Sequence, residues 1–377
     1  MVFWRILIGS MVVLMGLGII YLWTRFHKFR CMQRYGVQHR FLSWFLCLVP
    51  LAAIGLLYLI NLFTVVIVVL HLVLFWVLCD LLGWIINHLR KKKIYPTRGK
   101  KKKVRLTPYY AGIMALLLCA VYLGIGWYNA HHVRKTEYRF TTEKDLDGPL
   151  RIAAIADAHL GITLDGASFG SLLEEIQQQA PDILVIVGDF VDDDSLKADM
   201  LEATAALGRF EAPYGVYFVF GNHDNGYYRY RDFDSRDLRG ALVAHGVRIL
   251  EDGSKLVDDR FYVIGRQDRT VPGRAKASQL TRDLDQNKYM ILLDHQPNDY
   301  AGEAESGADL VISGHTHGGH LFPAGPIGEW MGANDRYYGT ERQEDTTFLV
   351  TSGVSGWAIP FKTGTFSEYV IIDIETK

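Results

Sequence analysis

Residues 308–320 read ADLVISGHTHGGH, and this segment is the strongest indication of the fold class that we expect for the second half of the chain. An apolar run of strand length ends at Ile312, and His315, His317 and a pair of glycines follow it. Glycine tolerates sharp turns and lets the backbone come close to a bound group. Because alternate residues of an extended chain point to one face, we expect the two imidazoles to reach one pocket together.

Four earlier apolar runs, over residues 150–157, 182–189, 215–222 and 289–295, also end in polar residues. Between some of these runs, apolar residues recur at helical spacing. Alternation of strands and helices with short loops predicts an α/β domain. Ligands of such sheets gather beyond the carboxyl ends of the strands. We therefore expect the strand exits to build one site from Asp157, His159, Asp189, Asn222, His295, His315 and His317.

These seven side chains offer carboxylate, amide oxygen and imidazole donors, and none offers sulfur. Such a set suits Mn²⁺, Fe, Zn²⁺ or Mg²⁺. Seven donors are more than one catalytic ion with an open position needs. They suit two divalent ions roughly 3.5–4 Å apart that share a bridging carboxylate.

The blocks D-x-H, G-D-x-x-D, G-N-H-D, a lone His and G-H-x-H follow one another between Asp157 and His317. In this order they resemble the calcineurin-like metallophosphoesterase superfamily, and the flanking sequence is most similar to its membrane-associated bacterial branch. The resemblance covers about residues 150–374 and implies two metal sites with a shared carboxylate. One ion would be held by Asp157, His159 and His317, the other by Asn222, His295 and His315, with Asp189 bridging both.

The resemblance also implies roles for three neighbours of the metals. His223 would face the phosphoryl group as proton donor or charge stabiliser, Asp224 would orient its imidazole, and Asp192 would support the site. The implied reaction is metal-assisted hydrolysis of a phosphoester or phosphoanhydride by an activated water, without a covalent enzyme intermediate. His320 departs from the family, whose members often carry Gln there, which leaves the outer substrate contact open.

Two groups of residues near these blocks allow more than one interpretation. Trp330, Trp357 and Phe361 either pack in the core, which we favour, or line an apolar approach to the site. The polar insert around residue 230 is either an exposed charged loop, which we favour, or brings Arg229 or Arg231 to the substrate phosphate.

Residues 1–130 have the pattern of a membrane protein. About 20 apolar residues are needed for one helix to cross a bilayer. Four spans are expected, because the long middle stretch fits two helices with a tight turn near Asn61. The apolar stretches are Ile6–Trp23, Phe41–Ile60, Leu62–Ile86 and Tyr109–Tyr128. A cleaved signal peptide at the first stretch is the less favoured alternative, because no small-residue cleavage site follows it.

Charge predicts the orientation of these spans. Residues 1–130 hold 16 lysines and arginines and one acid, Asp80, whereas residues 131–377 hold 24 basic and 40 acidic residues. The basic residues lie between spans 1 and 2 and in the segment 90–105, so both loops are expected in the cytoplasm. The chain beyond Tyr128 is then extracytoplasmic. Its acidic balance argues against nucleic acid as a partner, and all four cysteines precede it.

The sequence thus predicts a four-helix transmembrane module over 1–130, a linker over 131–149 and an α/β phosphoesterase domain over 150–377, a β-sandwich flanked by helices. The expected protein is a multi-pass membrane enzyme whose substrate is a phosphorylated small molecule or lipid, such as a phospholipid or a lipid-linked sugar (di)phosphate. Membrane lipids are the other expected partners, and protein partners are not predicted. The alternatives are a non-enzymatic sensor of a phosphate ligand and, with less support, a transporter.

Overall fold

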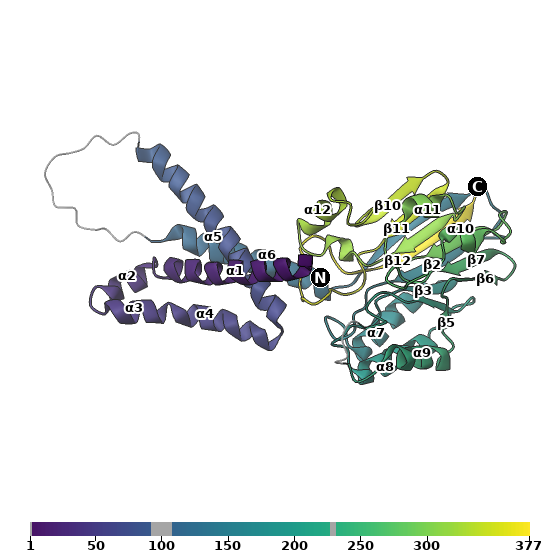
Figure 1. The fold of residues 1–377 in the computed structure, drawn as a ribbon, viewed down its shortest axis with the longest axis horizontal. Helices are drawn as coiled ribbons and strands as arrows, with labels where there is room; N and C mark the ends of the chain where they lie inside the picture. The colour runs from purple at the N-terminus through teal and green to yellow at the C-terminus, as the bar shows by residue number, and fades with distance from the viewer. Residues whose placement is uncertain (1, 92–107, 227–230) are drawn as a thin grey trace. The chain divides into compact units, whose positions relative to one another are not determined.

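The computed structural model describes residues 2–91, 108–226 and 231–377. The chain forms two compact units, Met1–Ile125 and Gly126–Lys377 (Figure 1). Most of the basic segment 90–105 lies outside the described residues.

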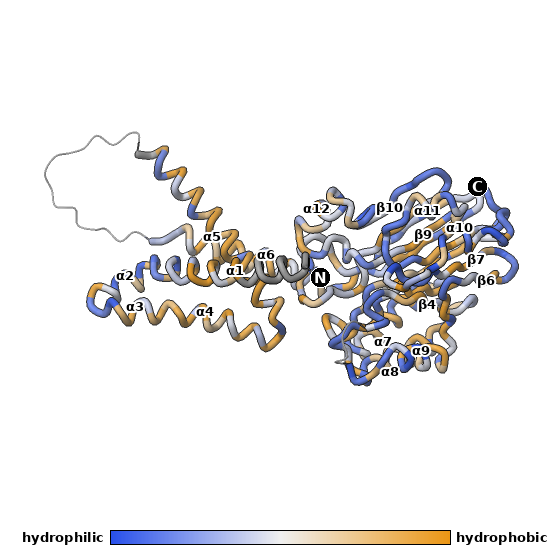
Figure 2. Tube along the Cα trace, viewed as in Figure 1, coloured by the Kyte–Doolittle hydropathy of each residue, from blue (hydrophilic) through white to orange (hydrophobic). Residues whose placement is uncertain are grey.

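The first unit consists of helices. Three helical stretches, Arg40–Leu59, Leu62–Leu89 and Tyr110–His131, are long and apolar enough to cross a membrane, and Val13–Phe26 is a shorter apolar helix among the described residues. Figure 2 shows the apolar residues along α4 and α5. The helices are α1 (Val2–Phe26), α2 (Arg30–Gly36), α3 (Arg40–Leu46), α4 (Leu48–Gly55), the 3-10 helix η1 (Leu56–Leu59), α5 (Leu62–Lys91) and α6 (Tyr110–His131).

Two polar residues organise this unit. Asn61 lies in the turn before α5, and its Oδ1 accepts a hydrogen bond from the backbone N–H of Thr64 at 2.7 Å. Asp80, the one acid of the segment 1–130, pairs with Arg25 Nε at 2.8 Å and accepts a hydrogen bond from Tyr109 Oη at 2.5 Å. A charge among apolar helices is costly unless it is paired, so this network explains how Asp80 is accommodated.

The second unit contains two six-stranded sheets. The first has the order β1-β12-β2-β3-β4-β5, and the second has the order β10-β11-β9-β8-β7-β6. The strands of the first sheet are β1 (Arg134–Thr142), β2 (Leu150–Ile155), β3 (Ile183–Val187), β4 (Val216–Val219), β5 (Arg248–Ile249) and β12 (Glu368–Thr376). Those of the second are β6 (Gly253–Val257), β7 (Phe261–Gly265), β8 (Tyr289–Leu293), β9 (Leu310–Ser313), β10 (Gly339–Gln343) and β11 (Thr346–Val350).

Side chains from both sheets share one buried apolar cluster, which includes Ile152, Val185, Ile291 and Ile312. Fully burying one such aliphatic side chain contributes about 1.5–3 kcal/mol. The runs of β3, β8 and β9 are continuously apolar because one face of each strand packs in this cluster and helices cover the other face. The covering helices are α7 (Gly166–Gln177), α8 (Lys197–Gly208) and α9 (Ser235–Ala244) on the first sheet, and α10 (Ala277–Thr281) and α11 (Tyr300–Ala304) on the second.

The stretch 131–149 differs from the linker that we expected. Residues 134–142 form β1, an edge strand that pairs in parallel with β12, so that Tyr138 lies opposite Ile372. The partner strand lies at the far end of the chain, and a local pattern carries no information about it. β1 is therefore part of the sheet that carries the first metal-ligand candidates.

The strand directions bring the predicted site residues to one region. β2, β3 and β4 run parallel in the first sheet, and β8 and β9 run parallel in the second. Asp157, Asp189 and Asn222 follow the first three strands, and His295 and His315 follow the other two. The site is thus built from strand exits of both sheets.

Candidate metal centre

The structure gathers the predicted donors into two groups. Donor atoms of Asp157, His159 and His317 all lie within 4.8 Å of one another, and so do those of Asp189, His295 and His315. A third group, His159, Asp192 and His223, adjoins the first through its shared imidazole. Most of these side chains are buried, so they form a polar cluster inside an apolar fold.

Asp189 belongs to the second group and also faces the first. Its Oδ2 is 3.0 Å from His295 Nε2 in one group and 3.7 Å from His159 Nε2 in the other. One carboxylate that faces imidazoles of both groups is in the position that a bridging ligand requires.

Asn222, at the exit of β4, is fixed next to Asp189. The backbone N–H of the following residue, His223, donates a hydrogen bond to Asp189 Oδ1 at 2.8 Å. The Asn222 side chain is buried, and its Oδ1 accepts a hydrogen bond from Gln296 Nε2 at 3.3 Å. This hydrogen bond from Gln296 identifies which end of the Asn222 side-chain amide is the oxygen and fixes its orientation.

The imidazoles are oriented through their Nδ1 atoms. His295 Nδ1 lies 2.8 Å from the carbonyl oxygen of Val187, and His159 Nδ1 lies 3.1 Å from Asp192 Oδ2. The Nε2 atoms of both rings are buried, and neither makes a hydrogen bond of ordinary geometry with a described residue. Metal-binding histidines typically hold one ring nitrogen in this way and present the other to the metal. The residues present therefore fit a pair of cations.

The backbone at the donor positions is strained. Asp157, His159, Asp189, His315 and His317 have φ values of 53°, 36°, 52°, 71° and 49°. Non-glycine residues rarely adopt this left-handed region, and such strain concentrates at functional sites. The donors thus stand in sharp turns after the strands.

These turns correct our expectation for His315 and His317. His315 lies with Asp189 and His317 lies with Asp157, in the two groups to which the resemblance assigned them, but the chain between them is not extended as we had assumed. The positive φ values at both residues turn the chain between them. One strand exit therefore supplies one nitrogen to each group.

Asp224 also differs from the role that the resemblance implied. The carboxylate beside His223 Nδ1 is Asp192, whose Oδ1 lies 2.9 Å away. Asp224 instead accepts hydrogen bonds from four backbone N–H groups, those of Asp189, Phe190, Val191 and Gly221, at 2.8–3.1 Å. Asp224 thus shapes the turn that carries Asp189, while Asp192 joins His223 to His159.

The electrostatics of the site favour cation binding. Burial raises the pKa of Asp157 to about 6 and lowers the pKa of His315 to about 4. Burial also lowers the pKa of His317 well below its usual range, so both of these rings are neutral at pH 7, as metal ligands must be. Burial alone would lower the pKa of His295 too, but the charge of Asp189 raises it well above its usual range.

Burial disfavours the charged form of His223 as well, but the hydrogen bond to Asp192 prevails and raises the pKa of this imidazole. The pKa of Asp192 is lowered, because its hydrogen bonds to His159 and His223 outweigh its burial. Asp192 is therefore an anion that favours a proton on His223.

Two glycines, which have no side chain, leave space for two of the donor residues. A Cβ atom at Gly188 would lie 2.5 Å from His295 Nδ1, and one at Gly353 would lie 2.6 Å from Asp157 Cβ. Both glycines also have positive φ values, 76° and 70°. Gly188 belongs to the G-D-x-x-D block, whereas Gly353, far away in sequence, was not apparent from any motif.

Three buried residues near the donors were missed in the sequence. Lys362 is fully buried, and its Nζ donates hydrogen bonds to the carbonyl oxygens of Ser352 and Gly353 at 2.6 and 3.2 Å. Burial lowers its pKa to about 7. Gln296 and Asp268 are the others, joined by a hydrogen bond from Gln296 Nε2 to Asp268 Oδ2 at 2.8 Å. Gln296 directly follows a predicted ligand, but Lys362 and Asp268 stand in no pattern that would have revealed them.

The residues with open interpretations are placed as follows. Arg231 donates hydrogen bonds to the carbonyl oxygens of His223 and Asp224, so it supports this loop, and Arg229 lies outside the described residues. Trp330 is 86% exposed, which rules out core packing for it. Trp357 is also exposed, and its ring lies 5.7 Å from that of His223 between centroids.

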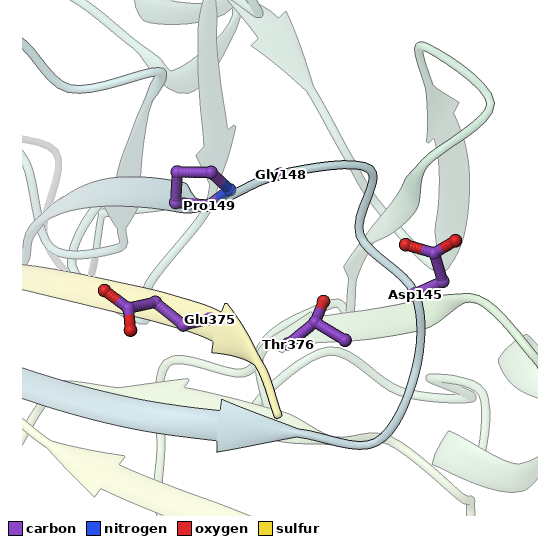
Figure 3. A pocket seen from close by; sticks show the side chains of 5 residues that line it. All are labelled: Asp145, Gly148, Pro149, Glu375 and Thr376. Atoms are coloured by element: carbon purple, nitrogen blue, oxygen red, sulfur yellow. The ribbon is translucent and has the colours of Figure 1, made fainter.

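A surface pocket elsewhere in this unit contains none of the predicted donors. It is lined by Asp145, Gly148, Pro149, Glu375 and Thr376 (Figure 3). Pro149 directly precedes β2, whereas Asp157 follows the other end of the same strand. The pocket therefore lies at the opposite end of β2 from the metal centre.

Comparison with known proteins assigns the family. The model of the calcineurin-like phosphoesterase family matches residues 150–319. An uncharacterised metallophosphoesterase of Aquifex aeolicus is 31% identical over 255 residues, which cover 66% of this chain and 94% of that protein. The chain belongs to the calcineurin-like metallophosphoesterase family. Its predicted donors lie in the region that the family model matches.

Two animal relatives are also similar. A transmembrane protein with metallophosphoesterase domain of Danio rerio is 28% identical over 299 residues, covering 74% of this chain and 65% of that protein. A metallophosphoesterase of Caenorhabditis elegans is 26% identical over 309 residues, covering 78% of this chain and 62% of that protein. The chain thus spans less than two thirds of the length of these two relatives. Three helices in the described part of this chain are long and apolar enough to cross a membrane, which favours a membrane protein.

Proposed function

We propose that the second unit is a dinuclear phosphoesterase. Asp157, His159 and His317 would hold one divalent cation, and Asn222, His295 and His315 the other, with Asp189 shared. The observation that carries this proposal is the pair of buried Nε2 atoms, on His159 and His295, that face Asp189 from two sides without a hydrogen bond of ordinary geometry to a described residue.

When bound, the two cations would neutralise phosphate charge and lower the pKa of a coordinated water. The chain's own residues supply the rest. Asp192 holds His223 at Nδ1 and favours the protonated ring, so His223 is set to stabilise the phosphoryl oxygens or to give a proton to the leaving oxygen. Asp224 fixes the backbone of the turn that positions Asp189.

For the whole protein we propose a multi-pass membrane enzyme with an extracytoplasmic phosphoesterase domain of sandwich architecture. The substrate would be a phosphoester or phosphoanhydride of the cell envelope, such as a phospholipid or a lipid-linked sugar (di)phosphate. The four spans expected from the sequence and the positive charge of the loops after spans 1 and 3 support this orientation. Digestion of the phosphoesterase unit by a protease added outside intact cells would support it, and complete protection would contradict it.

The metal stoichiometry tests the proposed centre. Full-length protein loaded with Mn²⁺ is expected to retain about two ions per chain by elemental analysis, in keeping with a two-metal site. His317→Ala and His295→Ala should each lose about one ion, because each removes a ligand of a different group. His245→Ala, an exposed histidine at the end of α9, is the matched control and should keep both. One ion in the wild-type protein would contradict the dinuclear assignment.

The reaction is tested with a panel of substrates. With Mn²⁺, the full-length enzyme is expected to hydrolyse bis-p-nitrophenyl phosphate, and comparison with p-nitrophenyl phosphate and a diphosphate separates the three bond types. A protein that binds two ions and hydrolyses none of these or any lipid phosphate would favour the sensor alternative.

A further inference from the structure

An exposed apolar segment follows the metal-binding turn of β9. Residues 321–333 read LFPAGPIGEWMGA and include α12 (Ala324–Trp330). Phe322, Ile327, Trp330 and Met331 are 61%, 48%, 86% and 71% exposed. Isolated exposed apolar residues are common, but four large ones so close together in the chain form a patch of the kind that marks an interaction site.

The only charged residue of this segment does not interrupt the patch. Glu329 is half-buried, and its Oε2 accepts a hydrogen bond from the backbone N–H of Tyr337 at 3.3 Å. The segment therefore presents tryptophan, phenylalanine, methionine and isoleucine to its surroundings with its one carboxylate engaged. Aromatic side chains of this kind favour the boundary between lipid and water.

Hydrogen bonds connect the base of the patch to the end of α6. Phe322 N–H donates to Thr363 Oγ1 at 3.1 Å, and Lys362 N–H, one residue earlier, donates to the carbonyl oxygen of Gly126 at 2.8 Å. Ser367 N–H donates to the carbonyl oxygen of Asn129 at 2.9 Å. All these residues belong to the unit Gly126–Lys377, so the connection is internal to it.

This connection identifies what covers the patch. Helix α6 is long and apolar enough to cross a membrane, and Gly126–His131 are its last residues. The segment 362–367 is bonded to that end of the helix and to Phe322. The patch therefore begins beside the end of a helix whose length and apolar character suit a membrane span, so it would be continuous with a membrane-embedded surface.

We propose that residues 321–333 insert into the interfacial layer of the membrane that α6 crosses. The occupant of the patch is the lipid surface itself, in the manner of amphipathic segments that lie in the membrane plane. Burying these four side chains at the lipid boundary removes apolar surface from water, at roughly 25 cal/mol per Å².

The insertion has a consequence for the substrate, and this part rests on the proposed function. The patch starts shortly after His317, and a Cβ atom at Gly319 would lie 2.7 Å from Gly325 Cα of α12. The turn that carries a metal ligand thus packs directly against the inserted segment. The metal centre is held near the headgroups, so the substrate is a phosphate group borne by a molecule whose apolar part stays in the bilayer.

Insertion is tested by lipid quenching in the full-length protein in vesicles. A nitrobenzoxadiazole fluorophore is attached to Ile327→Cys and, as matched control, to Val243→Cys, an exposed apolar position on α9. Signal from the four native cysteines is measured on the unsubstituted protein and subtracted. Nitroxide-labelled phosphatidylcholine should quench the fluorophore at position 327 several-fold more than at 243. Equal quenching would overturn the proposal.

A second copy of the chain is the rival occupant. If bismaleimide cross-linking joins two copies through Ile327→Cys while lipid nitroxide fails to quench that position, the patch is a contact between copies and the membrane proposal is overturned. Neither readout requires catalysis, so an inactive enzyme with strong quenching would overturn the proposed function and leave the insertion standing.

The substrate part is tested with Trp330→Ser/Met331→Ser. Hydrolysis of water-soluble bis-p-nitrophenyl phosphate is expected to stay at the wild-type rate, while KM for a phospholipid or phosphorylated lipid in vesicles rises by about tenfold, equivalent to about 1.4 kcal/mol. Leu201→Ser, at an exposed apolar position on α8, is the control and should leave both unchanged. An equal change with both substrates would overturn the lipid-phosphate assignment.

Discussion

Among single residues, the structure gives the carboxylates of Asp192 and Asp224 different partners. Asp192 bonds His223 and His159 through different oxygens, while Asp224 is fully engaged by four backbone N–H groups. One anion therefore couples the proposed proton donor to a proposed metal ligand. This predicts different outcomes for substitutions of His223 and of Asp192.

Replacing His223 removes the proton donor but none of the proposed metal ligands. His223→Ala is expected to lower kcat for bis-p-nitrophenyl phosphate by about 10²–10⁴, the usual contribution of a positioned acid or base. Metal content should stay at the wild-type value. The steady-state rate at saturating Mn²⁺ measures this, with His245→Ala as control. Wild-type activity in the His223 variant would refute the role proposed for this imidazole.

Removal of Asp192 should affect both catalysis and metal binding. Asp192→Ala leaves the Nδ1 atoms of His159 and His223 without their carboxylate, and loss of such an orienting partner typically costs about 10–100-fold in metal affinity or activity. A Mn²⁺ titration of activity should show a higher half-saturating concentration together with a lower maximum rate. Asp194→Ala, at an exposed position of the same loop, serves as control. An unchanged Mn²⁺ requirement would show that Asp192 does not orient His159.

Among the elements, the turns after the strands decide the site. The turn after β3 contains Gly188 at φ 76°, and the space where its Cβ would lie is filled by His295 from the exit of β8. The absence of a side chain at Gly188 thus allows the strand exits of the two sheets to pack against each other. A left-handed glycine also lies at Gly246, again at φ 76°, but a Cβ there would have no neighbour within 4 Å.

This pair of glycines allows backbone strain to be separated from displacement of a ligand. Both Gly188→Ala and Gly246→Ala introduce the strain of a left-handed alanine, about 1 kcal/mol. Only Gly188→Ala also displaces His295, so it alone should lose Mn²⁺ affinity, by about tenfold or more. Thermal unfolding and Mn²⁺ binding of the two variants measure these effects. Equal Mn²⁺ affinity in both would contradict the close packing of the two strand exits.

In the molecule as a whole, the metal centre concentrates buried charge in the otherwise largely apolar interior of the second unit. Asp157 and Asp189 are buried, and burial raises the pKa of Asp157 to about 6. Burying carboxylate charge away from water is costly, and cations bound beside it compensate that cost. Cations that bind only the folded chain are therefore expected to stabilise the phosphoesterase unit.

Chelation should consequently lower the stability of the full-length protein. At a metal concentration 100 times the dissociation constant, bound metal adds about 2.7 kcal/mol, and EDTA removes this contribution. Thermal unfolding in detergent with Mn²⁺ or EDTA measures the change as a shift in Tm. His295→Ala, which lacks one proposed ligand, should show a smaller shift. Identical Tm values for the wild-type protein in both conditions would argue against buried cations.

The family, the α/β class and the identity of the clustered donors could all be predicted from the amino-acid order. Apolar runs followed by D-x-H, G-D-x-x-D, G-N-H-D and G-H-x-H are local patterns, and parallel strands necessarily bring their exits to one side. The apolar helices and the turn at Asn61 could be located too, because length and hydropathy are local properties. These are the features that neighbouring residues encode.

The backbone turns and side-chain contacts that produce this grouping, in contrast, depend on long-range packing. His315 and His317 separate because left-handed turns replace the extended chain that alternation assumes, and Asp192 rather than Asp224 reaches His223 because two loops converge. The segment 134–142 forms a strand because β12, at the far end of the chain, pairs with it. Lys362 and Trp330 carry no local signal, since burial of the one and exposure of the other depend on what packs beside them. Contacts between distant segments have no local pattern, and only the folded chain brings them together.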